Sequence, residues 1–175
     1  MADLRVAQIM KDSIVDGPGL RYVIFTQGCY HKCEGCHNPQ THDPTGGMTK
    51  NTDDLFIEIM LNPTYTGVTF SGGEPFLQSD ALADLAIKIK HSSRKDDLDI
   101  ICYTGYTFEQ LWESIHKNNI MSHMRLLYNI DYLIDGPFIK DKASLECKWR
   151  GSTNQRIIDV KATIRNNGAI VEADI

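Results

Sequence analysis

This 175-residue chain has neither a long hydrophobic run nor an excess of positive charge. No uninterrupted apolar run reaches the roughly 18–20 residues that cross a bilayer, and residues 1–19 lack the apolar core and cleavage site of a secretory signal. The formal net charge of -5 offers no broad basic surface to nucleic acid. We therefore expect a cytoplasmic protein that binds neither membrane nor nucleic acid.

Internal repeats, low-complexity tracts and Pro/Ser-rich linkers are also missing. Nothing in the sequence marks a domain boundary, and the chain is long enough for one sizeable core but short for two. The sequence predicts a single domain over residues 1–175.

Cysteine is present in a number that does not suit a disulfide scaffold. There are five cysteines, an odd count, and three of them crowd into residues 29–36. A disulfide framework would spread cysteines in pairs, so a reduced metal site is the better interpretation.

Apolar, β-branched runs bounded by turn residues predict four strands, at 20–26, 67–73, 98–104 and 131–137. Helical patterns fall between them, at 52–61, 79–91 and 107–118, the last opening with a capping-box pattern at Thr107 and Gln110. Alternation of strands and helices predicts an α/β fold with a parallel sheet.

Chain length limits how many strand–helix units this fold can hold. A closed eight-unit barrel takes roughly 30 residues per unit, so this chain fills about five or six. We expect a partial, open (β/α) barrel, with a doubly wound sheet as the alternative. In both folds ligands bind at the carboxyl ends of the strands.

Cys29, Cys33 and Cys36 form a C-x3-C-x2-C loop that begins where the first predicted strand stops. Thiolates suit iron and zinc, and this spacing lets three sulfurs face one centre. Three thiolates on a 4Fe-4S cluster leave one iron without a protein ligand. A Cys3His zinc site using His31 or His37 is the competing interpretation, and Cys102 or Cys147 is a candidate for a fourth thiolate.

The second predicted strand runs directly into Ser71-Gly72-Gly73-Glu74-Pro75. Two glycines permit a close ligand approach, and carbonyls with the Glu74 carboxylate can accept hydrogen bonds from an ammonium group. A plain strand-to-helix turn is the alternative interpretation of this motif.

The cysteine loop and the GGEP turn together resemble the radical S-adenosylmethionine (SAM) enzymes. Asp16-Gly17-Pro18-Gly19 and His37-Asn38-Pro39 are similar to the glycyl-radical activating branch. Trp149–Arg156 (WRGSTNQR) is similar to the C-terminal signature of anaerobic ribonucleoside-triphosphate reductase activating proteins. The resemblance covers roughly residues 13–159. It implies an open barrel of the radical SAM type, in which SAM chelates the open iron.

The resemblance also implies roles for particular residues. Cys29, Cys33 and Cys36 would hold the cluster, whereas Tyr30, Gly72, Gly73, Glu74, Thr104, Gly105 and Arg150 would contact SAM. For Thr104-Gly105 a plain turn is equally reasonable, and Arg150 has the alternative of docking the partner.

The implied activity is hydrogen abstraction from a backbone glycine of the large subunit of anaerobic ribonucleoside-triphosphate reductase, with an electron donor such as flavodoxin. Two rival functions remain open at this point. One is another small radical SAM enzyme, such as a pyruvate formate-lyase activase or a deazapurine-forming enzyme, and the other is a non-catalytic iron–sulfur or zinc module.

Overall fold

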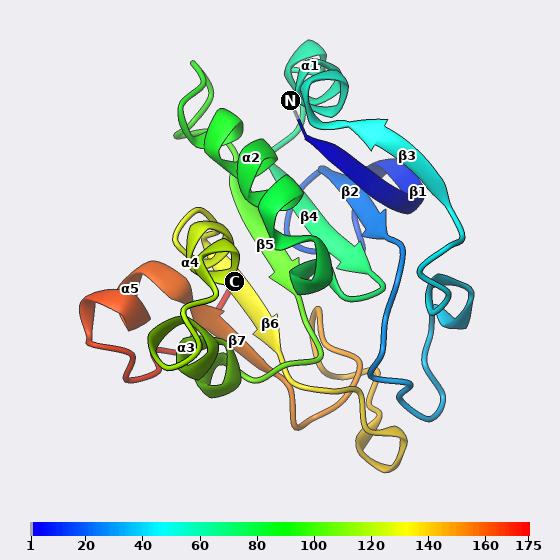
Figure 1. Ribbon diagram of the computed structural model, residues 1–175, viewed down its shortest axis with the longest axis vertical. Coiled ribbons are helices and arrows are strands. Elements are labelled where there is room, and N and C mark those ends of the chain that lie inside the picture. Colours follow the sequence, from blue (N-terminus) through cyan, green and yellow to red (C-terminus); the bar gives the residue numbers. More distant parts are fainter. Residues whose placement is uncertain (1) are drawn as a thin grey trace.

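The computed structural model describes residues 2–175 and contains one seven-stranded sheet, with strand order β3-β1-β2-β4-β5-β6-β7 (Figure 1). Its centre is parallel and consists of β2 (Arg21–Thr26), β4 (Gly67–Gly72), β5 (Asp99–Tyr103) and β6 (Tyr132–Asp135). These four strands are the four predicted from apolar runs, each within two residues of its expected bounds.

Three antiparallel strands that the sequence patterns did not predict extend this centre. They are β1 (Asp3–Ser13), which pairs with β2, β3 (Met48–Asn51), which pairs with β1, and β7 (Arg156–Asp159), which pairs with β6. The α/β class and the open sheet are therefore confirmed, but four parallel strands are fewer than the five or six units expected. The length estimate failed because β1 and the long loops after β2 and β6 use residues without adding a unit.

Five α-helices connect or follow the strands: α1 (Thr52–Leu61), α2 (Ser79–Lys90), α3 (Phe108–His116), α4 (Met121–Leu127) and α5 (Val160–Arg165). Three short 3-10 helices lie at Pro39–Thr41, Pro75–Gln78 and Lys140–Lys142. The predicted capping box is present, since the Thr107 side chain accepts from the Gln110 backbone and the Gln110 side chain accepts from the Thr107 backbone. Within residues 2–175, no helix combines the length and the apolar character needed to cross a bilayer.

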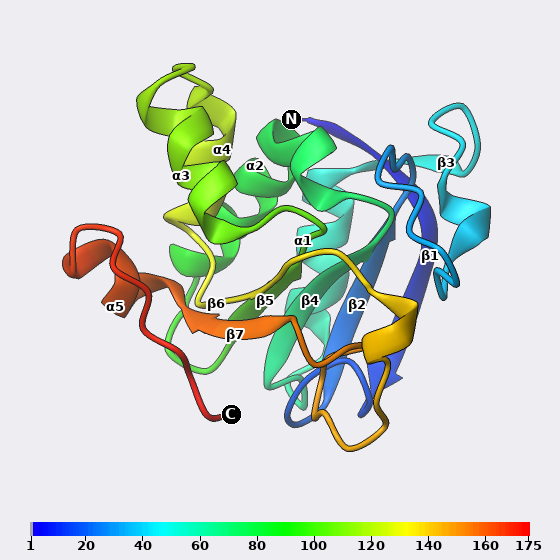
Figure 2. The same ribbon diagram turned by 90° about the horizontal axis from the view of Figure 1, so that it is seen from below.

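The main core lies between the sheet and the helices on one side of it. Figure 2 shows α2, α3 and α4 on the same side of the sheet, and α1 packs against α2. The predicted apolar face of α2 is buried there, with Leu82, Leu85 and Ile89 fully inaccessible. Side chains alternate along a strand, so every second strand residue points away from these helices. On that other side of the sheet a smaller hydrophobic cluster forms around Ile101, Ile134 and Ile157.

Arg21 lies buried on this second side of the sheet, at the amino end of the parallel strands. Its fully buried guanidinium donates to Thr69 Oγ1, to the Val68 carbonyl and, at 2.5 Å, to Asp99 Oδ1. It also donates to the Pro18 carbonyl, which explains the DGPG motif as a turn that packs on this arginine. The contact of Asp16–Gly19 with Arg21 gives this motif a structural role.

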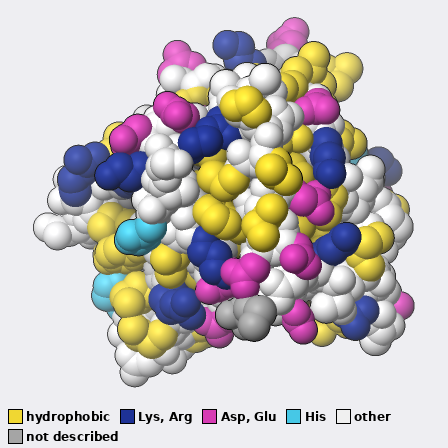
Figure 3. All heavy atoms as spheres, turned by 90° about the horizontal axis from the view of Figure 1, so that it is seen from above, with side chains coloured by type: hydrophobic (Ala, Val, Ile, Leu, Met, Phe, Trp, Pro, Cys, Tyr) yellow, Lys and Arg dark blue, Asp and Glu magenta, His cyan; other side chains and the backbone are white. Residues whose placement is uncertain are grey.

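The surface at the amino end of the strands carries exposed apolar side chains. Figure 3 looks onto this end, where hydrophobic side chains gather near the middle with charged ones around them. Helix α1 lies at this end (Figure 1), and its Ile57 and Leu61 are 54% and 77% exposed. The cysteine loop leaves the opposite end of the sheet.

Candidate functional site

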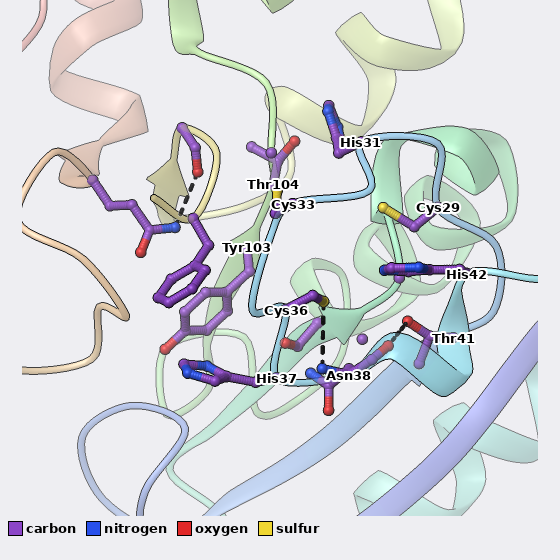
Figure 4. Close-up of a pocket in the computed structure, with 17 residues that line it drawn as sticks. Cys29, His31, Cys33, Cys36, His37, Asn38, Thr41, His42, Tyr103 and Thr104 are labelled. Atoms are coloured by element: carbon purple, nitrogen blue, oxygen red, sulfur yellow. Dashed lines mark hydrogen bonds between the residues drawn. The ribbon is translucent and has the colours of Figure 1, made fainter. Parts of the chain in front are cut away.

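A cavity lies at the carboxyl ends of the parallel strands, where the sequence predicted ligand binding. Cys29, Cys33 and Cys36 all line it, together with residues that follow β4, β5 and β6 (Figure 4). The remaining lining residues are His31, His37, Asn38, Thr41, His42, Ser71, Gly72, Gly73, Tyr103, Thr104, Gly105, Gly136, Phe138 and Gln155. The cysteine loop, defined as residues 27–38, forms one wall.

The cysteine loop is held by the chain segment that follows it. The backbone N–H of Gly28 donates to the Thr41 carbonyl at 2.7 Å, and that of Cys29 donates to the His42 carbonyl at 3.2 Å. Cys36 Sγ accepts from the Asn38 backbone at 3.4 Å. All three thiols are free, and burial raises the pKa of Cys29. The loop therefore presents three reduced sulfurs to one cavity.

The donor set fits a multi-iron cluster better than a single metal ion. Among residues 2–175, no three His, Cys, Asp or Glu side chains converge closely enough to hold one ion. His31 Nε2 is bonded to Glu74 Oε2 at 2.8 Å, and the His37 ring packs on Phe138 with centroids 4.8 Å apart. A 4Fe-4S cluster takes its thiolates on different irons, so its ligands surround a volume rather than a point.

The two other cysteines do not reach this cavity. Cys102 is fully buried on the helix-facing side of β5, within the main core, and burial raises the pKa of its thiol. Cys147 lies in the loop between β6 and β7 and is not a lining residue. In the described chain, three is thus the number of cysteines at the cavity.

Glu74 connects the three loops that surround the cavity. Its carboxylate is 1% exposed and accepts four hydrogen bonds: Oε1 from the Phe76 backbone and Thr104 Oγ1, and Oε2 from the Gly105 backbone and His31 Nε2, at 2.8–3.0 Å. A carboxylate with two oxygens and about four lone-pair sites has its acceptor capacity filled by these donors. Glu74 is not among the cavity-lining residues.

Gly72 and Gly73 do line the cavity, and their lack of a side chain serves packing. A Cβ on Gly72, which has φ +97°, would lie 2.5 Å from the Thr26 nitrogen, and one on Gly73 would lie 2.3 Å from the Gly28 carbonyl oxygen. The two glycines therefore let the end of β4 press against the start of the cysteine loop. The close approach predicted for a ligand is made here by the chain itself.

The predicted site residues fall into two groups. Thr104 and Gly105 line the cavity beside Gly72, Gly73 and the cysteines. Tyr30 and Arg150 do not line the cavity. Tyr30 is 67% exposed, and Arg150 donates to the Gln155 carbonyl at 3.0 Å. Sequence reasoning assigned no role to Thr41 or His42, because a Thr-His pair after the cysteines carries no recognisable signal.

The RGSTNQR segment, residues 150–156, is fixed to the end of β6. Gln155, a lining residue, donates through Nε2 to the Gly136 carbonyl and accepts at Oε1 from the backbones of Gly151 and Ser152. Arg156 bonds the buried Asp135 and the exposed Glu109. Much of the polar character of this segment is used in folding the loop that carries Gln155 to the cavity wall.

Comparison with known proteins gives concordant results. A family model described as a 4Fe-4S single cluster domain matches residues 15–158. The anaerobic ribonucleoside-triphosphate reductase-activating protein of Vibrio cholerae is 34% identical over 148 residues, covering 82% of this chain and 90% of the relative. Proteins of the same name from Escherichia coli K12 and Enterobacteria phage T4 are each 33% identical over 147 residues, covering 81% and 82% of this chain and 90% and 86% of the relatives. The chain therefore belongs to the 4Fe-4S single cluster family and, within it, to the anaerobic ribonucleoside-triphosphate reductase-activating proteins.

Proposed function

We propose that this protein activates an anaerobic ribonucleoside-triphosphate reductase by generating a glycyl radical on it with SAM. One observation carries the proposal: Cys29, Cys33 and Cys36, without a fourth cysteine, face one cavity in a chain whose relatives are named as activating proteins of that reductase. A three-thiolate cluster keeps one iron available to a small molecule.

The three cysteines would hold the 4Fe-4S cluster. When bound and reduced, this group supplies the electron that splits SAM into methionine and a 5′-deoxyadenosyl radical, which takes a hydrogen atom from a glycine of the reductase. The chain itself would bind and orient SAM and shield the site. Phe138 and Tyr103, which line the cavity, are the aromatic groups placed to exclude water.

SAM would lie against the ends of β4 and β5. Gly72, Gly73, Thr104 and Gly105 line the cavity and would offer backbone carbonyls to its methionyl amine. The backbone N–H groups of Gly73, Thr104 and Gly105 already donate within the protein. Glu74 would contribute by fixing Thr104, Gly105 and His31 in place, because its own oxygens are saturated. Tyr30 and Arg150 remain predictions for SAM binding that require their side chains to turn toward the cavity.

The proposed partners follow from the same chemistry. The large subunit of the reductase would present its glycine to the cavity, and a sheet that is open rather than closed into a barrel would leave room for a protein loop. An electron donor such as flavodoxin would reduce the cluster. Five free cysteines support a reducing, cytoplasmic compartment.

Anaerobic reconstitution with iron and sulfide tests the proposal. We expect an electron paramagnetic resonance (EPR) signal from the reduced cluster that changes when SAM is added. Cys36→Ser should abolish the SAM-responsive signal, whereas the matched control Cys147→Ser should keep it, because Cys147 lies away from the cavity. A cluster signal indifferent to SAM would contradict the proposal and favour a non-catalytic iron–sulfur module.

Addition of the reductase then separates the enzymatic alternatives. The proposal predicts 5′-deoxyadenosine together with a persistent organic radical on the reductase polypeptide. Deoxyadenosine formed without that radical would instead favour a radical SAM enzyme that acts on a free metabolite.

A further inference from the structure

His42 has a buried nitrogen without a hydrogen-bond partner at the wall of the cavity. In residues 2–175, three buried side-chain polar atoms have no partner: His42 Nε2, Arg150 Nε and Asn154 Oδ1. Of these three residues, His42 is the one that lines the cavity with the cysteines. A buried polar atom without a partner lowers the stability of the fold, so its presence calls for a ligand or another explanation.

The backbone fixes His42 beside Cys29. His42 follows the 3-10 helix Pro39–Thr41, and its N–H donates to the Pro39 carbonyl at 3.2 Å. Its carbonyl accepts from the Cys29 backbone at 3.2 Å. Figure 4 shows the ring next to Cys29 on the same side of the cavity, with its nitrogen end directed inward. The imidazole is therefore placed by the same contacts that place the first cysteine.

The three cysteine sulfurs are candidate acceptors for a hydrogen bond from His42 Nε2, because they line the same cavity. The two other histidines of the cavity have their own neighbours, since His31 is bonded to Glu74 and the His37 ring packs on Phe138. A neutral imidazole with its proton on Nε2 is a hydrogen-bond donor. Thiolates and sulfides of an iron–sulfur cluster accept such bonds, and these bonds are one of the determinants of the cluster's reduction potential.

We propose that His42 Nε2–H donates a hydrogen bond to a sulfur of the cluster, either the Cys29 thiolate or an inorganic sulfide, and thereby raises the reduction potential. This inference rests on the proposed cluster. In it His42 is a hydrogen-bond donor to the cluster and not one of its ligands. The bond raises the potential because a donor stabilises the more negative, reduced cluster more than the oxidised one.

The test is an EPR-monitored redox titration of the reconstituted protein. His42→Phe keeps a planar ring and removes the donor, so its midpoint potential should fall by an amount that corresponds to roughly a tenfold change in the reduction equilibrium, about 59 mV for one electron. His42→Gln keeps an N–H donor and should retain at least half of the wild-type effect. His91→Phe, a change at an exposed histidine after α2, is the matched control and should leave the potential unchanged.

The measured potentials distinguish a hydrogen bond from His42 to the cluster from a contact with SAM or a packing role. A His42→Phe potential that changes by less than a factor of two in equilibrium, about 18 mV, would overturn the proposal. An unchanged potential with weakened SAM-induced EPR changes would also overturn it and place Nε2 against SAM. Cluster loss from both variants would assign the ring to packing and overturn it too, whereas loss from His42→Phe alone would support a required donor.

Failure of this inference differs from failure of the proposed function. If the wild-type protein assembles a SAM-responsive cluster and His42→Phe titrates like wild type, the proposed function stands and the role of His42 falls. If the wild-type cluster ignores SAM, the proposed function falls, while the potential of His42→Phe still reports on the hydrogen bond.

Discussion

Replacement of Glu74 by alanine tests how the cavity is built. The Glu74 carboxylate is buried and accepts from Thr104 Oγ1, from His31 Nε2 and from the backbones of Phe76 and Gly105. Thr104 Oγ1 also accepts from the Tyr106 backbone, so its own proton is committed to Glu74. The alanine variant would leave four donors without an acceptor, two of them backbone N–H groups.

The expected loss of stability can be worked from these contacts. Each buried backbone N–H left unpaired costs about 1–3 kcal/mol, and hydrogen bonds to a charged acceptor are each worth about 1.5–3 kcal/mol. Because water partly compensates and the terms are not additive, we expect a total of roughly 3–6 kcal/mol. That loss is a large fraction of the ~5–15 kcal/mol that stabilises a typical domain. Glu74→Gln keeps one carbonyl oxygen and should lose about half as much.

Urea unfolding followed by circular dichroism provides the measurement, with variants compared anaerobically at the same iron content. A loss of this size lowers the unfolding midpoint by about 1–3 M. Glu113→Gln is the matched control: Glu113 is an exposed partner of Lys117 one helical turn away, and its loss should cost less than ~0.5 kcal/mol. A Glu74→Ala protein within about 1 kcal/mol of wild type would refute the idea that Glu74 fixes the loops.

Three further predictions concern other parts of the molecule. Gly72→Ala should destabilise the protein by roughly 2–4 kcal/mol in the same urea assay, because its φ is +97° and its Cβ would meet the Thr26 nitrogen at 2.5 Å; a neutral effect would contradict this packing. Cys102→Ala should keep the full iron content by chemical analysis, and iron loss would restore Cys102 as a ligand candidate. The hydrogen bond from Arg156 lowers the pKa of Glu109 to about 2, so this pair stabilises the fold above the ordinary Glu pKa near 4.5 and loses its effect as pH falls toward 2. Because Glu109 is 60% exposed, the difference between wild type and Glu109→Gln in urea unfolding of cluster-free protein should be at most about 1 kcal/mol at pH 7 and about half of that at pH 3; a constant difference would contradict the assignment.

The central elements of the fold were predictable because their signals are local. Apolar β-branched runs gave β2, β4, β5 and β6, and the helical spacing in residues 52–61 and 79–91 gave α1 and α2. By contrast, β3 and β7 are four-residue strands at the sheet edges, too short for a clear period. Strand β1 has half-exposed residues along much of its length, so its alternation is weak. Such strands are defined by partners distant in sequence.

Short spacings in the sequence predict which reactive groups lie together at the site. Cys29, Cys33 and Cys36 lie within eight residues, so one loop necessarily carries three thiols, and the GGEP turn follows a strand whose carboxyl end lies beside that loop in a parallel sheet. Both inferences depend on short spacing and on one topological rule, and the cysteines, Gly72 and Gly73 line one cavity in the structure.

The tertiary structure alone decided which nearby groups serve the cavity. Cys102 lies outside the cavity because it is buried in the main core on the helix-facing side of β5. The oxygens of Glu74 are filled by donors from three loops, and His42 has a nitrogen without a partner. No sequence pattern predicts these outcomes, because they depend on side-chain direction and on hydrogen bonds between residues as much as 43 positions apart. Spacing fixes how many sulfurs a loop can offer, whereas the packing of the sheet decides what surrounds them.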